Sequence, residues 1–295
     1  MMKIIIALGG NAMILPKERG SKEEQVKHIR YTAKRLESLV DRNQCVITHG
    51  NGPQVGNLMI QQEATGEVPK MPLDVLVAET QGELGYMLQQ EFDNAFDKDV
   101  ITIVTQVVVD KNDAAFQNPT KPVGPFFKEP KSGYKEDAGR GYRKVVSSPM
   151  PLEVLEAEQI NSLISDNACV IACGGGGIPV VQIAPGKHEG VEAVIDKDLA
   201  SQVLGNQIGA DLLIILTTVP YAYLNFGKTN QKQIEKMTID EAKKYLEKGE
   251  FAEGSMAPKI RASIRFLENG GRKVIITDID TLDPALKLEA GTIIE

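Results

Sequence analysis

Short apolar runs recur along the chain and divide it into a regular series of segments. The runs are rich in valine, isoleucine and leucine, and several are followed by glycine. Runs of this length and composition are typical of strands that are buried on both faces of a sheet. The expected strands are residues 3–8, 45–48, 100–109, 168–172, 212–216, 273–277 and 291–294.

Between the expected strands, apolar residues return at the spacing of amphipathic helices. The first helix is expected after Ser21, which forms a capping-box signature with Glu24. Its apolar positions are Val26, Ile29, Ala33, Leu36 and Val40. Further helical patterns fall within 199–208 and 260–267. Strands that alternate with helices in this way predict an α/β fold with a largely parallel sheet covered on both faces.

The segment 117–150 breaks this alternation. It is rich in glycine, proline, lysine and aromatic residues and has little sustained periodicity. A stretch of this length without regular elements is usually functional or forms a small subdomain. We interpret it as an excursion from the main sheet.

The composition is that of an ordinary globular protein. Of 295 residues, 42% are hydrophobic and 25% are charged, which argues against disorder and allows one large α/β domain or two small ones. The 33 basic and 40 acidic residues give a formal charge of −7. A net-acidic protein is a poor partner for nucleic acid, although local lysines and glycine-rich backbone can still attract a small anion.

Targeting and metal-binding patterns are missing from the sequence. No apolar run reaches the roughly 20 residues that a membrane-spanning helix requires. The first residues lack the length and cleavage pattern of a signal peptide and fit a first strand. Cys45, Cys169 and Cys173 show no zinc-type spacing, and neither do the three histidines. We expect buried, reduced thiols in a cytoplasmic protein without a membrane segment.

Four glycine-rich segments stand out at residues 9–11, 50–52, 174–177 and 254–256. Glycines after a strand let the backbone turn sharply and direct amide N–H groups at an anion. In an open α/β sheet such loops gather at the carboxyl edge of the strands, where ligands bind. One loop of this kind is often only a tight turn, but several at equivalent places favour phosphate or anion binding.

The familiar nucleotide-binding motifs are absent. No Gly-x-Gly-x-x-Gly follows the first expected strand, and the His-Arg-Asp and Asp-Phe-Gly motifs of protein kinases are not found. Gly227, Lys228 and Thr229 resemble the end of a P-loop, but Ala222 occupies the place of its first glycine. These absences argue against the two familiar phosphate-binding folds and favour a third kind of phosphoryl-transfer site.

Three lysines occupy unusual settings. Lys121 lies between prolines, whereas Lys197 and Lys259 lie at the starts of expected helices. A lone lysine is most often a solvated surface residue. The helix dipole disfavours a lysine at a helix N-terminus, but a bound phosphate would reverse the local sign. Lys197 and Lys259 are therefore candidates for binding phosphate.

Two aspartates flank Lys197 in the sequence. Asp196 and Asp198 are of the residue type that caps helix N-termini. Alternatively, Asp198 orients Lys197 or holds a metal-bound water. The sequence pattern leaves these alternatives open.

Eight segments together closely resemble the signatures of the carbamate kinases, which belong to the amino-acid kinase superfamily. They are ALGGNA (7–12), THGNGPQVGN (48–57), NPTKPVGPF (118–126), EDAGRGYRKVV (136–146), ACGGGGIPV (172–180), GVEAVIDKDLAS (190–201), LTTVPYAYLNFGK (216–228) and GSMAPKIRA (254–262). The resemblance runs nearly end to end, in order. Only 127–134, which is short for the family, and 277–288, which matches poorly, depart from it.

The resemblance implies a three-layer αβα sandwich around one mainly parallel open sheet. The chain would form a single domain, 1–295, with a carbamate-binding part at about 1–190 and a nucleotide-binding part at about 191–295. Residues 117–150 would form a small protruding lid over the acceptor site. Family members are typically homodimers, and the helical stretch 74–96 is either part of the dimer contact, as we expect, or a core-packing element.

The resemblance also implies roles for individual residues. Lys197 would neutralise charge on the transferring phosphoryl group, and Asp198 would organise the lysines. Lys121 would reach carbamate from the lid, and Lys259 would hold the nucleotide phosphates. The remaining implied contacts are Gly10, Asn11, Gly50 and Asn51 to carbamate or the phosphoryl group, Gly174 and Gly175 along the phosphate path, and Gly254, Ser255 and Met256 near the nucleotide.

The implied reaction is the reversible transfer of a phosphoryl group between ATP and carbamate, which gives ADP and carbamoyl phosphate. Mg²⁺ would be held mainly by the nucleotide phosphates, without a direct protein ligand. Three alternatives remain: another kinase of the superfamily, a non-catalytic nucleotide sensor with the same fold, and a dehydrogenase. The dehydrogenase is supported only by the α/β pattern, and the NPTKP segment argues against the other kinases.

Overall fold

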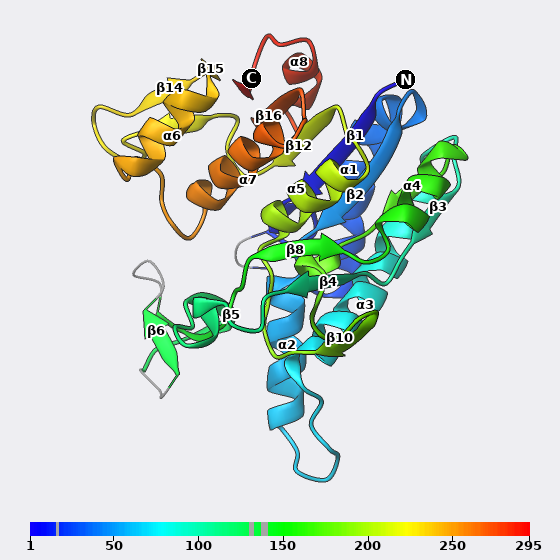
Figure 1. Cartoon of the computed structure of the whole chain (residues 1–295), viewed down its shortest axis with the longest axis vertical. Coiled ribbons are helices and arrows are strands. Elements are labelled where there is room, and N and C mark those ends of the chain that lie inside the picture. The colour runs from blue at the N-terminus through cyan, green and yellow to red at the C-terminus, as the bar shows by residue number, and fades with distance from the viewer. Residues whose placement is uncertain (16–17, 130–132, 137–140) are drawn as a thin grey trace.

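An eight-stranded sheet forms the centre of the computed structural model (Figure 1). Its strand order is β15-β17-β16-β12-β1-β2-β9-β3. The neighbouring strands pair in parallel, except for the antiparallel pair β16–β17. The strands are β1 (Lys3–Leu8), β2 (Gln44–His49), β3 (Val100–Thr102), β9 (Cys169–Ile171), β12 (Leu212–Leu216), β15 (Lys236–Met237), β16 (Lys273–Thr277) and β17 (Thr292–Ile294).

The structure describes residues 1–15, 18–129, 133–136 and 141–295, without the side chains of Asn11, Pro125 and Phe126. Within these ranges, no helix combines the length and the apolar character that crossing a membrane requires.

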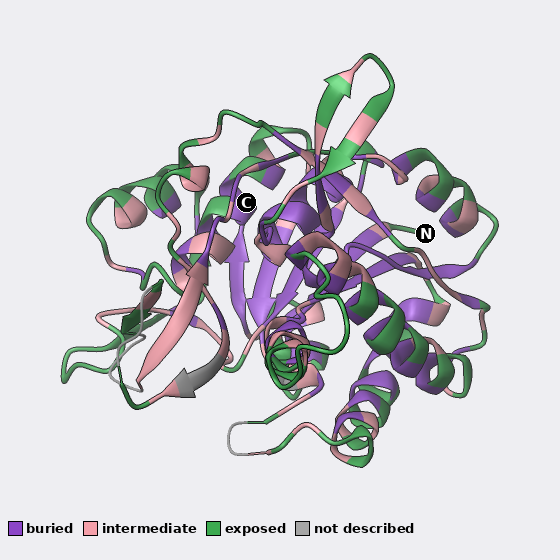
Figure 2. Cartoon of the chain, turned by 90° about the horizontal axis from the view of Figure 1, so that it is seen from below, coloured by how far each residue is buried: buried purple, intermediate pink, exposed green. Residues whose placement is uncertain are grey.

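Helices cover both faces of the sheet, as the alternation of strands and helices predicts. Along β1, Ile4, Ile6 and Leu8 point into one core with α1 (Lys22–Asp41), α3 (Leu73–Asp93) and α8 (Leu282–Leu286). Ile5 and Ala7 point into the other core, with α4 (Ala157–Ser165), α5 (Lys197–Gln207) and α7 (Met256–Glu268). Figure 2 shows the buried strands at the centre and helices with exposed outer faces. This confirms the three-layer α/β fold.

The first helix begins where its capping box predicts. The Glu24 amide donates to the Ser21 hydroxyl at 3.3 Å, and the Ser21 amide donates to the Glu24 carboxylate at 2.9 Å. On the inner face of this helix, Ile29, Ala33 and Leu36 are fully buried.

The single strand expected at 100–109 is wrong. Val100–Thr102 is edge strand β3 of the main sheet, whereas Gln106–Val109 is β4 of a separate sheet with the order β11-β10-β4-β8. The chain leaves the main sheet at Thr105, whose buried hydroxyl and amide bond to other segments. The other strands of this sheet are β8 (Pro151–Val154), β10 (Ile178–Ala184) and β11 (Lys187–Gly190).

The segment 117–150 carries a small antiparallel sheet beside the main body, in the order β5-β7-β6 (Figure 1). Its strands are β5 (Lys121–Phe127), β6 (Tyr134–Glu136) and β7 (Tyr142–Val146), and residues 137–140 of the EDAGRG motif lie outside the described ranges. Helix α2 (Gly52–Glu63) packs directly on β5, because a Cβ on Gly56 would lie 2.1 Å from the Cα of Gly124. The small sheet is therefore seated on the main body by backbone contact.

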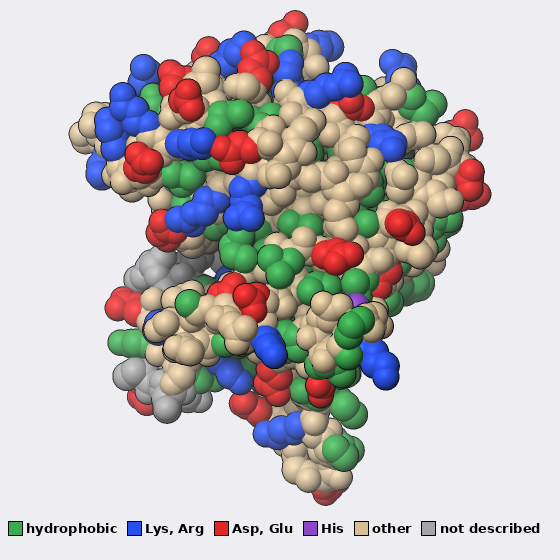
Figure 3. Space-filling view, viewed as in Figure 1, with side chains coloured by type: hydrophobic (Ala, Val, Ile, Leu, Met, Phe, Trp, Pro, Cys, Tyr) green, Lys and Arg blue, Asp and Glu red, His purple; other side chains and the backbone are tan. Residues whose placement is uncertain are grey.

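The remaining elements are short. Helix α6 (Ile239–Glu247) and the pair β13 (Ala222–Leu224) and β14 (Lys232–Ile234) lie in the last third of the chain, and the 3₁₀ turns are η1 (Gly10–Ala12), η2 (Ala114–Phe116) and η3 (Gly174–Gly176). On the face in Figure 3, acidic and basic side chains are interspersed.

Candidate functional site

Three glycine loops meet at the carboxyl edge of the main sheet. They follow β1, β2 and β9, which are parallel neighbours. The loop after β2 touches α5, since a Cβ on Gly50 would lie 3.8 Å from Cδ of Lys197. Gly174 and Gly175, after β9, pack on the β2 loop, since their Cβ atoms would meet His49 at 2.7 Å and Asn51 at 2.2 Å. The structure thus brings these predicted glycines together.

The tetraglycine run adopts backbone conformations that suit only glycine. Gly175, Gly176 and Gly177 have φ of 68°, 94° and 88°, in the left-handed region. A Cβ on Gly176 would also lie 2.3 Å from the carbonyl oxygen of Ile195. The turn therefore packs directly against the segment that leads into α5.

Asp198 lies between Lys197 and Lys259. Lys197 Nζ donates to Asp198 Oδ1 at 2.6 Å, and Lys259 Nζ donates to Oδ2 at 2.7 Å. The side chain of Asp198 is 4% exposed, and those of the two lysines are 12% and 13% exposed. We call these three residues the Asp198 cluster. Helices α5 and α7, which supply them, pack side by side.

The charges in the cluster shift each other's pKa. Burial alone would raise the pKa of Asp198, but the two ammonium groups outweigh it and hold the pKa below its ordinary value. Burial lowers the pKa of Lys197, with Asp198 opposing this. For Lys259, the attraction of Asp198 outweighs burial and raises the pKa. An ionised Asp198 therefore organises two cations, with both of its oxygens in use.

Two serine hydroxyls bond to the helical turns that carry Lys197 and Lys259, and one of them also contacts the main sheet. The Ser201 hydroxyl lies 2.6 Å from that of Thr48 on β2 and donates to the Lys197 carbonyl at 2.6 Å. The Ser263 hydroxyl donates to the Lys259 carbonyl at 2.7 Å. Sequence analysis missed these serines. Their only sequence signal is a serine four residues after each lysine, which fits bonding to the preceding helical turn.

Lys121 does not join the Asp198 cluster. It begins β5, and its Nζ donates to Asp196 Oδ2 at 2.6 Å. Asp196 also caps α5, with Oδ1 accepting from the amides of Asp198 and Leu199 at 3.0 and 3.4 Å. Of the two sequence alternatives for the aspartates, Asp196 thus takes the capping role and Asp198 the lysine-orienting role.

The other predicted residues lie around these groups. Gly10 is exposed in η1, and the side chain of Asn11 lies outside the described part of the structure. Asn51 is buried and donates to Thr80 Oγ1 at 2.8 Å. Gly254 and Ser255 precede α7, which begins at Met256. The geometry contradicts none of their predicted roles, which stay predictions.

A buried histidine and glutamine support the glycine loops, and sequence analysis assigned neither a role. Gln81 of α3 donates to the Gly174 carbonyl at 3.1 Å and accepts from the Thr105 amide at 2.8 Å. His49 lies against Gly174, and burial lowers its pKa to about 4. At neutral pH this imidazole is uncharged, and its Nδ1 lies 3.1 Å from the Gly50 carbonyl oxygen, so that it supports the loop after β2.

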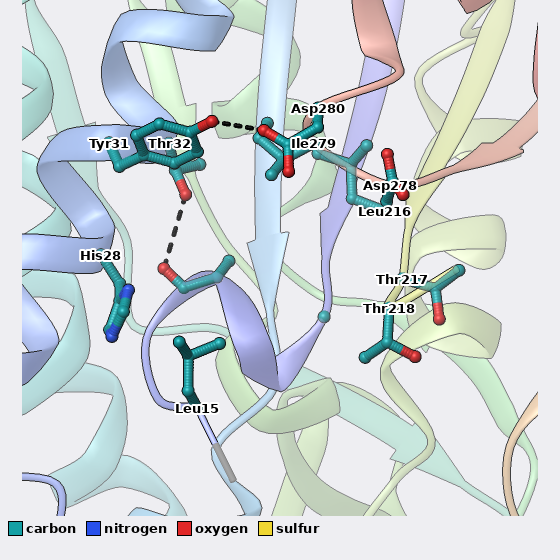
Figure 4. A pocket seen from close by; sticks show the side chains of 12 residues that line it. Leu15, His28, Tyr31, Thr32, Leu216, Thr217, Thr218, Asp278, Ile279 and Asp280 are labelled. Carbon is teal, nitrogen blue, oxygen red and sulfur yellow. Dashed lines mark hydrogen bonds between the residues drawn. The ribbon is translucent and has the colours of Figure 1, made fainter. Parts of the chain in front are cut away.

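A first cavity lies beside the glycine loop after β1, and a second lies beside the end of α2. The first cavity, of about 300 Å³, is at the carboxyl ends of β1, β12 and β16, where Gly9, Thr217 and Asp278 meet α1 (Figure 4). The second cavity, of about 250 Å³, lies between the last turns of α2 and the base of the 117–150 segment. Neither cavity is lined by Lys197 or Lys259.

Comparison with known proteins identifies the family. The model of the amino acid kinase family matches residues 2–278. The carbamate kinases of Oenococcus oeni and Thermococcus kodakarensis are 49% and 46% identical to this chain, over 99% of the chain and 98% of each relative. A structure of the Giardia lamblia carbamate kinase bound to AMP-PNP matches with a TM-score of 0.91 at 41% identity, over 99% of this chain and 98% of that one. The chain therefore belongs to the amino acid kinase family and, within it, to the carbamate kinases.

Proposed function

We propose that this kinase catalyses the reversible, Mg²⁺-dependent transfer of a phosphoryl group between ATP and carbamate. The observation that carries the proposal is the Asp198 cluster, in which one buried carboxylate aligns two lysines beside the glycine loops. The similarity to carbamate kinases along nearly the whole chain supports the choice of substrate. The AMP-PNP complex of the Giardia lamblia enzyme supports ATP as the nucleotide.

The chemistry matches a site built from cations and backbone amides. Carbamate is an anion, so its attacking oxygen needs no general base to remove a proton. His49, the histidine beside the loops, is buried and neutral and has no proton-transfer role in the proposal. Phosphoryl transfer instead requires alignment and neutralisation of the charge that develops between donor and acceptor.

Each cation has a defined task in this scheme. Lys197 contacts the transferring phosphoryl group, and Lys259 holds the nucleotide phosphates, with Asp198 fixing the distance between them. The amides around Gly10, Gly50 and Gly174 donate to phosphoryl or carbamate oxygens. Preorganised donors of this kind stabilise a transition state without reorganisation cost during the reaction.

Mg²⁺ adds neutralisation of phosphate charge when it is bound with the nucleotide. Among the described residues, no group of three His, Cys, Asp or Glu side chains could enclose a metal ion. Both oxygens of Asp198 already accept from lysines. This donor set fits an ion held by the nucleotide phosphates.

Three features of the wider protein complete the proposal. Residues 117–150 act as a lid that brings Lys121 to the acceptor. The enzyme is a cytoplasmic homodimer, with α3 as part of the contact. The buried, free thiols of all three cysteines suit a reducing compartment.

A substrate panel tests this function. The purified enzyme should form ATP rapidly from ADP and carbamoyl phosphate with Mg²⁺. ATP formation should be at least 100-fold slower with acetyl phosphate, because the site is built for the carbamoyl group. Comparable rates with another acyl phosphate would favour a different kinase of the family. A folded protein that binds ADP and forms no ATP with any donor would favour a nucleotide sensor.

A further inference from the structure

Asp196 joins the 117–150 segment to the start of α5. Its two carboxylate oxygens have separate partners. Oδ1 accepts from the first amides of α5, at Asp198 and Leu199, whereas Oδ2 accepts from Lys121 Nζ at 2.6 Å. A single side chain therefore caps the helix that carries Lys197 and also holds the lysine of the lid.

The residue that precedes Asp196 packs on the tetraglycine turn. The carbonyl of Ile195, the preceding residue, packs on Gly176, where a Cβ would approach it to 2.3 Å. The side chain of Asp196 is 13% exposed. The backbone that leads into Asp196 is thus packed on the tetraglycine turn, and the carboxylate itself is bonded to the first amides of α5.

Lys121 is more exposed and less constrained. Its side chain is 35% exposed, and Asp196 is the partner that the structure gives its ammonium group. An ammonium group has three N–H donors, so one bond to Asp196 leaves two for another acceptor. A lysine side chain has many rotamers, and ordering it before substrate binds removes that entropic cost from the binding step.

The charges are suited to this arrangement. Three ammonium groups, those of Lys121, Lys197 and Lys259, face two carboxylates, those of Asp196 and Asp198. Asp196 acts electrostatically on Lys197 and Lys259 as well. The group as a whole has an excess positive charge for an anionic substrate, and every lysine has a fixed carboxylate that sets its direction.

We propose that Asp196 is a positioning residue that directs Lys121 at the phosphoacceptor. Lys121 keeps its bond to Asp196 and uses its remaining N–H groups to bind the carbamate or carbamoyl end of the substrate. This inference rests on the proposed function for the identity of the acceptor. It assigns a separate and additional role to Asp196, which acts through Lys121 and does not touch the substrate.

The test is Asp196→Asn. Asparagine caps helices about as well as aspartate, so the start of α5 is retained while the charge that holds Lys121 is lost. We expect KM for carbamoyl phosphate to rise about 10-fold while KM for ADP changes less than 2-fold, by analogy with the loss of one charge-assisted hydrogen bond. In the Lys121→Ala background, adding Asp196→Asn should raise the KM for carbamoyl phosphate less than 2-fold, because the contact with Lys121 is already absent and only the weaker electrostatic effect on Lys197 and Lys259 remains.

Two outcomes would overturn the proposal. One is an unchanged KM for carbamoyl phosphate in Asp196→Asn. The other is a full effect of Asp196→Asn in the Lys121→Ala enzyme, which would show that Asp196 acts without Lys121.

Hydrogen exchange of the substrate-free enzyme separates this inference from the proposed function. Backbone amides in β5 should exchange faster in Asp196→Asn than in the wild type, and equally fast in Lys121→Ala, because both variants release the same tether. If the wild-type enzyme did not use carbamoyl phosphate, the proposed function would be wrong. The exchange measurement would still show whether the contact between Asp196 and Lys121 holds β5 in place. Unchanged exchange in β5 would refute it.

Discussion

At the scale of single residues, the site depends on charges that are held out of water. Each carboxylate oxygen of Asp198 accepts a hydrogen bond from one lysine, Oδ1 from Lys197 and Oδ2 from Lys259. Removing one partner of a buried charge group costs about 3–5 kcal/mol, because the remaining charges lose their compensation. The Asp198 cluster therefore ties α5 to α7.

His49 provides a pH-dependent test at this scale. Burial lowers its pKa from 6.5 to about 4. Above pH 6.5 the imidazole is neutral in both the folded and the unfolded protein, so it does not make the free energy of unfolding depend on pH. As the pH falls from 6.5 towards 4, the unfolded chain takes up a proton that the folded protein does not. The free energy of unfolding should therefore fall by about 3 kcal/mol from this residue alone.

The variant His49→Gln isolates this contribution. Urea unfolding between pH 7 and pH 4 should show a loss of stability smaller by about 3 kcal/mol than in the wild type, since glutamine does not titrate. Parallel stability curves for the two proteins would mean that His49 is protonated, or accessible to solvent, in the folded state.

The candidate residues were partly predictable from the sequence, and the limits have a physical reason. Glycine loops and lysines at helix starts are local signals, and they mark Gly50, Gly174, Lys197 and Lys259. The contact of Ser201 with Thr48 joins residues 153 positions apart and leaves no local pattern. The contact of Lys121 with Asp196 joins residues 75 positions apart and likewise leaves no local pattern. The sequence around Lys121 does not show whether its partner is Asp196 or Asp198.

At the scale of elements, the tetraglycine turn positions the start of α5. Gly176 allows the backbone to approach the Ile195 carbonyl, and Asp196, Lys197 and Asp198 follow directly. A substitution in the turn should therefore shift the start of α5, and with it Lys197, without altering any charged residue.

The substitution Gly176→Ala tests this coupling. A left-handed φ costs a non-glycine residue about 1–2 kcal/mol, and the close Ile195 carbonyl must also move. We expect ATP formation to fall at least 10-fold. The matched control is Gly186→Ala in the turn between β10 and β11, where φ is 69° and a Cβ would meet nothing within 4 Å.

Gly186→Ala should lose only the stability that the left-handed backbone costs, without the displacement of a neighbouring carbonyl, and keep its activity, measured by thermal unfolding and the same assay. Equal loss of activity in both glycine variants would mean that the turn acts only through stability.

Elements were predicted best where both sheet faces are buried. The runs at 3–8, 212–216 and 273–277 coincide with β1, β12 and β16, because continuous apolar character is itself the signal for such strands. The run at 100–109 is equally apolar, but it changes sheets at Thr105. The break depends on the hydrogen bond that the Thr105 amide donates to Gln81 and on the one that the Cys173 amide donates to the Thr105 hydroxyl, and the run itself does not encode these partners.

At the scale of the whole molecule, the parallel sheet gathers distant segments at one edge. Loops after β1, β2 and β9 and the first turn of α5 come from residues up to about 190 positions apart, yet they meet in one place. Two helices from the same face then supply the Asp198 cluster. The small sheet of 117–150 rests on α2 and reaches this edge through Lys121.

In the proposed mechanism Lys197, held by Asp198, stabilises the transferring phosphoryl group. The most direct measurement is the turnover of ATP formation from ADP and carbamoyl phosphate in Lys197→Ala, beside the control Lys34→Ala on the exposed face of α1. For this role of Lys197 we expect a loss of kcat on the order of 100-fold or more in Lys197→Ala, with ADP binding retained, and no loss in Lys34→Ala. Near-normal turnover in Lys197→Ala would contradict it.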